Sequence, residues 1–164
     1  MYSILMVANN ILDKSFADNI LITPGKLQRI AYLVDSEYRT LTGESLVSEQ
    51  WETWTHGAHS AVIHHIFDGK NNRNIKKFAR DINGHTLKVD EAKNTSLDIA
   101  LNNIWESTKN LSYHSLCHAV RLPGSAWDKA YQEDQKLISH QDMVEDTTYR
   151  SVLALPWEKP SGQH

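Results

Sequence analysis

The chain has 164 residues, of which 40% are hydrophobic and 23% are charged, and its formal net charge at pH 7 is −3. This length and composition are typical of a single globular domain with a buried core of its own. The small negative charge argues against a dedicated nucleic-acid-binding protein, and no apolar run is long enough for a membrane-spanning helix.

The first third of the chain predicts two helices, over residues 3–16 and from Pro24 to about Thr42. In the second helix Thr23 is a suitable N-cap, and Pro24 suits the first helical position, where its missing N–H costs nothing. Apolar residues then recur at steps of three and four residues up to Gly43, which stands where a C-terminal cap would. The start of the chain has no basic segment or small-residue cleavage site, so we expect no signal peptide.

The middle of the chain is less regular. Residues 44–56 predict an extended or mixed segment, residues 60–67 a short helix and residues 68–74 a mobile loop. Asn83-Gly84 lies between apolar residues, which favours a small β-hairpin at this point. Residues 75–82 are equally compatible with a helical turn.

The second half predicts four further helices and a flexible tail over 156–164. The helices begin at Thr95 or Ser96, at Ser112, at Ser125 and at Ser139, and the last two cover about 126–135 and 140–154. We therefore expect a mainly α fold, a compact single-domain bundle of six to seven helices over residues 1–155. A small β-hairpin near Asn83-Gly84 would complete it.

Nine histidines and one cysteine raise the question of a metal site. His114, Cys117 and His118 lie on one helix face and could present N, S and N to zinc, with a fourth ligand from His56, His59, His64 or His65. Alternatively, Cys117 is a small core residue and the histidines are capping or surface groups. Because one local triplet lacks a second ligand pair, we expect no metal site. A lone cysteine cannot form an internal disulfide, which fits a cytoplasmic protein.

The sequence contains no catalytic motif. A phosphate-binding glycine loop, a Gly-x-Ser-x-Gly elbow and a His-Glu-x-x-His helix are all missing. Cys117 precedes His118, but neighbours on a helix diverge by about 100°, so adjacency does not make a thiolate–imidazole pair. We therefore predict that the protein is not an enzyme and binds no cofactor.

Two features favour a binding surface instead. Trp54 and Trp127 lie near the ends of predicted elements, and tryptophan is enriched in binding hot spots, although both could equally be buried in the core. Residues 69–80 contain several Lys and Arg and no acidic residue. This stretch is either a solvated loop or a contact for an acidic partner or a phosphate backbone.

Three sequence blocks carry a family resemblance. The first joins ANNIL (8–12) to the stretch from Ile22 to Tyr32 (ITPGKLQRIAY). The second joins residues 43–46 to ETWTHGA (52–58), and the third joins LSYHSLCH (111–118) to GSAWDKAY (124–131). Their order and spacing resemble the Panacea domain of Soc-type antitoxins, proteolytic adaptors and phage-associated proteins. The resemblance extends from about Ala8 to Leu153. It departs from the family pattern at Gly25, Arg29, His56, Ala58, Cys117 and Ala126.

The resemblance implies an antitoxin-like protein that neutralises a cognate toxin, in a bacterial or phage-borne system, by direct protein–protein binding. An adaptor that delivers the toxin to a AAA+ protease is the alternative. A nucleic-acid-binding regulator and a small metal-dependent enzyme are less favoured. We expect the partner-binding surface around the second and third blocks, with the basic stretch at its rim. The residues predicted for it are Trp54, His56, Gly57, His59, His118, Ser125, Trp127, Lys76 and Lys77.

Overall fold

The computed structural model describes residues 1–67 and 72–155, and within these ranges the predicted mainly α, compact fold is confirmed. The helices are α1 (Ile4–Ala17), α2 (Pro24–Thr42), α3 (Ala61–Ile66), α4 (Thr95–Thr108), α5 (Tyr113–Val120), α6 (Ala126–Gln132), α7 (His140–Glu145) and α8 (Thr148–Val152). A 3-10 turn, η1 (Glu91–Lys93), precedes α4, and β1 (Glu52–Trp54) pairs with β2 (Gly57–His59). The predicted tail over 156–164, and part of the predicted loop over 68–74, lie outside the described residues.

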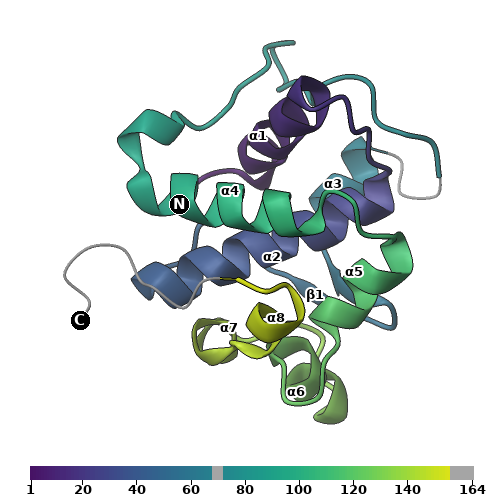
Figure 1. Ribbon diagram of the computed structural model, residues 1–164, viewed down its shortest axis with the longest axis vertical. Coiled ribbons are helices and arrows are strands. Elements are labelled where there is room, and N and C mark those ends of the chain that lie inside the picture. Colours follow the sequence, from purple (N-terminus) through teal and green to yellow (C-terminus); the bar gives the residue numbers. More distant parts are fainter. Residues whose placement is uncertain (68–71, 156–164) are drawn as a thin grey trace.

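Helix α2 is the centre of the molecule. Figure 1 shows α4 lying along it, with α1 above and α5 to α8 below, and α2 contacts most of these elements and β2. The predicted caps are both present, since the Thr23 hydroxyl accepts the Lys26 N–H and Gly43 adopts a left-handed conformation with φ of 78°. In the described ranges, no helix combines the length and apolar character needed to cross a bilayer.

A buried carboxylate on α2 positions the segment that leads to the hairpin. Asp35 is fully buried and accepts hydrogen bonds from Arg39 Nη2 at 2.7 Å, from Trp51 Nε1 at 2.8 Å and from the Leu46 backbone N–H at 3.0 Å. Because a buried carboxylate is costly unless it is paired and hydrogen-bonded, these partners hold residues 46–51 firmly against α2.

The small hairpin lies at residues 52–59, so its predicted position at Asn83-Gly84 is wrong. Residues 81–85 form a turn in which the Asp81 carboxylate accepts N–H groups of Asn83 and His85. The backbone on the two sides of this turn forms no strand pair, because asparagine side chains of α1 take up its N–H and carbonyl groups. Asn9 exchanges hydrogen bonds with the backbone of Ala79, as Asn10 does with Val89, at 2.8 to 3.0 Å.

The predicted helix over 140–154 is interrupted, and α7 and α8 take its place. Asp146 is extended between them, with ψ of 114°. Its carboxylate accepts the backbone N–H of Ala126 at 3.0 Å and the backbone N–H of Thr148 at 2.9 Å. The bond to Ala126 connects the interruption between α7 and α8 to the start of α6. Helical periodicity in the sequence cannot reveal such a tertiary contact.

Candidate functional site

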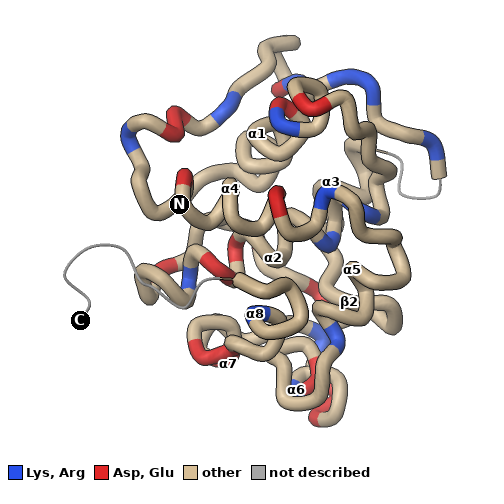
Figure 2. The backbone as a smooth tube through the Cα atoms, in the orientation of Figure 1, with Lys and Arg blue, Asp and Glu red and all other residues tan. Residues whose placement is uncertain are grey.

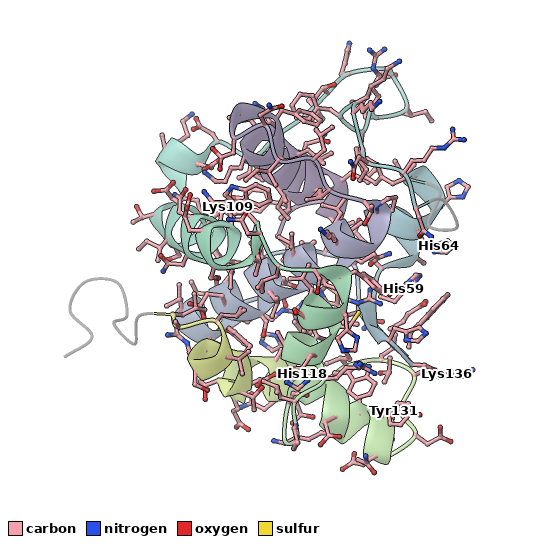
Figure 3. The ribbon with its side chains drawn as sticks, turned by 45° about the vertical axis from the view of Figure 1, so that its right-hand side comes forward. His59, His64, Lys109, His118, Tyr131 and Lys136 are labelled. Atoms are coloured by element: carbon pink, nitrogen blue, oxygen red, sulfur yellow. The ribbon has the colours of Figure 1, made fainter. Side chains whose placement is uncertain are left out.

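A small pocket lies between the first turns of α2, the β1–β2 hairpin, α3 and the start of α5. We call it the Arg29 pocket. Its volume is about 170 Å³, and it is lined by Pro24, Gly25, Gln28, Arg29, Trp54, His56, His59, His64 and Tyr113. Figure 3 shows two of these residues, His59 and His64, on the same side of the molecule, with Lys136 and Tyr131 below them. Four of the predicted partner-binding residues lie in or beside this pocket, namely Trp54, His56, Gly57 and His59.

Arg29 holds the hairpin against α2. Its guanidinium donates from Nε to the His56 carbonyl at 3.3 Å, from Nη1 to the Ala58 carbonyl at 3.1 Å and from Nη2 to the Tyr113 hydroxyl at 3.4 Å. The side chain is only 4% exposed. It therefore covers the outer edge of β2, where carbonyl groups would otherwise lack partners.

Two glycines leave room for side chains that pack tightly around the pocket. Gly57 has φ of 141°, and a Cβ atom there would lie 2.8 Å from Arg29 Nε. A Cβ atom on Gly25 would lie 2.8 Å from Cε1 of Tyr113. The departure from the family pattern at Gly25 thus has a physical reason, because the Tyr113 ring needs this space. Glycine inside a helix costs about 1 kcal/mol relative to alanine.

An aromatic stack forms the outer wall of the pocket. The rings of Trp54 and His59 are stacked with centroids 3.6 Å apart, and the His64 ring lies 5.0 Å from that of His59. Trp54 is 47% exposed and donates from Nε1 to Glu52 Oε1 at 2.8 Å, whereas His59 is 6% exposed. Burial, reinforced by His64 and Arg29, lowers the pKa of His59 to about 4, so its imidazole is neutral at pH 7.

Ser125 and Trp127 support this wall from behind. Trp127 is buried, donates from Nε1 to the Trp54 carbonyl at 2.8 Å and stacks on the exposed ring of Tyr131. Ser125 is fully buried, and its hydroxyl caps α6 by accepting the Asp128 N–H. Their side chains therefore hold the wall in place from inside, while the Trp54 ring is exposed to solvent.

His118 belongs to a different hollow. It is exposed on α5 and lines a depression with His114 and Val152. Cys117, between them on the helix, is buried. In the part of the chain that the structure describes, no three His, Cys, Asp or Glu side chains are grouped as metal ligands would be.

Lys76 and Lys77 are exposed on the basic segment, by which we mean residues 72–80. This segment lines a hollow of about 940 Å³ with Phe67, and Pro24 lines both that hollow and the Arg29 pocket. Figure 2 shows Lys and Arg spaced along this part of the chain. The two hollows therefore share Pro24, and a basic rim for the partner-binding surface stays a prediction.

Sequence reasoning did not identify Arg29, His64 or Tyr113 as site residues. Arg29 appeared only as a replacement within a motif, and His64 only as a spare metal ligand. The available signal was the pair Gln28-Arg29, two polar residues in the middle of the apolar pattern of α2. Both side chains bond backbone groups of the hairpin region, since Gln28 pairs with the N–H and the carbonyl of Ser60.

Residues 27–128 match the family model described as "Antitoxin SocA-like, Panacea domain". The matched range begins in α2, contains the hairpin, α3, α4 and α5, and ends in α6. It therefore includes Arg29, Trp54, His59, His64 and Tyr113. A search of curated proteins and a search of solved structures found no match for this chain.

Proposed function

Because the chain belongs to the SocA-like antitoxin family with the Panacea domain, we propose that it neutralises a cognate toxin in the cytoplasm by direct protein–protein contact. Membership of an antitoxin family is the observation that carries this proposal. Seven of the nine residues that line the Arg29 pocket lie within the matched range, and Pro24 and Gly25 precede it.

Neutralisation of this kind requires surface complementarity and no covalent chemistry, so we infer that the protein is not an enzyme. An interface of standard size buries about 1,600 Å² in total. Trp54 is suited to its centre because it offers a large apolar ring that is already held in place by the stack on His59 and the Nε1 bond to Glu52. A side chain that is ordered before binding loses less entropy when the complex forms.

Co-expression with the product of the neighbouring reading frame tests the proposal. We expect that product to stop growth alone, growth to recover with this protein, and the two purified chains to elute as one stoichiometric complex. Trp54→Ala should weaken the complex by about tenfold or more and reduce rescue. The control is Ile82→Ala, since Ile82 is a fully exposed apolar residue on the turn over 81–85.

Two outcomes would contradict direct neutralisation. One is that no toxin, from the neighbouring frame or captured from the native cell, forms a stable complex. The other is rescue that requires a AAA+ protease and shortens the half-life of the toxin, which would show an adaptor.

A further inference from the structure

We propose that the Arg29 pocket binds a carboxylate of the protein partner, an aspartate or glutamate side chain that enters beside Trp54 and pairs with Arg29. This inference rests on the proposed function, because it specifies the chemistry by which the toxin is recognised. It is independent of the basic segment.

Arg29 carries a positive charge that no carboxylate of the described ranges balances. The guanidinium is buried, and its three acceptors are two backbone carbonyls and a tyrosine hydroxyl, all neutral. No aspartate or glutamate of the described ranges forms an ion pair with it. The two other buried arginines of α2 and α8, Arg39 and Arg150, each pair with a carboxylate. Since buried charges are normally paired, Arg29 is suited to an anion supplied from outside.

Two N–H donors of Arg29 have no acceptor within the described ranges. A guanidinium has five N–H donors. Three donate to the acceptors named above, which leaves one on Nη1 and one on Nη2. These two nitrogens form the end of the fork that pairs with both oxygens of a carboxylate.

The imidazole of His59, which stacks on Trp54, is a second group with unused hydrogen-bonding capacity. It lines the pocket, is more than nine-tenths buried and makes no hydrogen bond with any described residue. His64, half-buried on α3, faces the same pocket. Two imidazoles and a guanidinium thus surround a space with no acidic side chain among its lining residues.

The size and opening of the pocket favour a carboxylate on a protein over a larger ligand. A volume of about 170 Å³ accommodates the end of one acidic side chain. The half-exposed indole of Trp54 at its edge would then lie against the partner surface around that side chain. Tryptophan and arginine are both enriched in interface hot spots. Free phosphate is also an anion, so the test must distinguish binding of a carboxylate from binding of phosphate.

The test uses the full chain labelled with ¹⁵N and ¹³C. The protein is titrated with sodium acetate and, in a parallel experiment at equal ionic strength, with sodium chloride. The chemical shifts of the Trp54 indole and the His59 imidazole are followed by NMR. We expect saturable shifts with acetate and none with chloride. His64→Glu should abolish them, because it places a competing carboxylate inside the pocket. His65→Glu is the matched control, since it makes the same charge change on an exposed neighbour of α3 that does not line the pocket.

The outcomes separate this inference from the proposed function. Support requires acetate binding lost in His64→Glu and kept in His65→Glu, with toxin affinity lowered about tenfold or more in His64→Glu alone. If inorganic phosphate causes saturable shifts and acetate does not, the pocket is a site for a free anion and the inference is overturned. Unchanged toxin affinity in His64→Glu would overturn it as well and leave direct neutralisation intact. If no toxin binds the unaltered protein, the proposed function fails, whatever acetate does.

Discussion

At the scale of single residues, this protein depends on polar groups inside its core. Asp35 and Glu37 lie on α2 and are fully buried, and each pairs with an arginine. Burial raises the pKa of Glu37, and its pairing with Arg150 and the Tyr149 hydroxyl opposes this rise. Such groups favour one arrangement of the neighbouring elements, because any other arrangement leaves a buried charge without a partner.

Asp35→Ala should therefore lower the free energy of unfolding by about 3–5 kcal/mol, since it removes the acceptor of Arg39, Trp51 and Leu46 together and leaves Arg39 buried without its carboxylate. Urea denaturation measures this change. Asp13→Ala is the control. Asp13 forms a partly exposed ion pair with Lys88, so its loss should lower the free energy of unfolding by no more than about 1 kcal/mol. Similar losses in the two variants would contradict the role given to Asp35.

His59 predicts a dependence of stability on pH. Folding lowers its pKa from 6.5 to about 4, mainly by burial and further through His64 and Arg29. Between these pH values the unfolded chain binds more protons, so the free energy of unfolding should fall as the pH drops from 6.5 towards 4. His59→Phe keeps a ring on Trp54 and removes the titration. Urea denaturation at several pH values should show a smaller fall in this variant, and an equal fall would assign the effect to other groups.

At the scale of elements, side-chain amides of α1 take the place of a β-ladder. The segment 75–90 lies over α1, with Ala79 bonded to Asn9 and Val89 to Asn10. An irregular segment can be buried only if its backbone groups find such partners. The basic segment is therefore anchored at one end by the bonds between Asn9 and Ala79.

Asn9→Ala should free this end of the basic segment at a cost of about 1–3 kcal/mol, because the backbone N–H and carbonyl of Ala79 both lose their partner. Hydrogen exchange followed by NMR should show loss of protection at the Ala79 amide. The Val89 amide serves as an internal control, since Asn10 still holds it. Protection that is retained at Ala79 would mean that other contacts hold the segment.

At the scale of the whole molecule, the charge is unevenly distributed. The chain is weakly acidic overall, and the basic segment lines a hollow that shares Pro24 with the pocket that we assign to a partner carboxylate. Charges at the rim of an interface act chiefly on the association rate, whereas buried charge pairs act on dissociation. The basic segment and Arg29 should therefore affect toxin binding differently.

Reversing Lys76 and Lys77 together to Glu should lower the association rate constant several-fold at low salt, and the effect should shrink at high salt. The dissociation rate should change little. Stopped-flow or surface-plasmon measurements with the purified toxin would show this. Lys93→Glu, on the exposed turn η1, is the control. Equal rates for all three proteins would make the basic segment an ordinary solvated loop.

The starts of five helices could be read from the sequence because they depend on local contacts. Thr23, Ser60, Ser112, Ser125 and Ser139 each cap a helix by accepting an N–H three residues ahead. A hydrogen bond between residues three apart needs no knowledge of the rest of the chain. The mainly α fold and the order of its helices follow from such signals and from apolar periodicity.

Tertiary structure alone decided where the hairpin forms and how the Arg29 pocket is assembled. Asn-Gly at residues 83–84 favours a hairpin, but the backbone on either side of it bonds instead to Asn9 and Asn10, about 70 to 80 residues earlier in the chain. Arg29 meets Ala58 and Tyr113 only after α2, the hairpin and α5 have packed together. Local propensity determined where these helices begin, since each cap depends on neighbours in sequence. Burial of polar groups determined the site, since its partners are distant in sequence and are brought together only by the packed core.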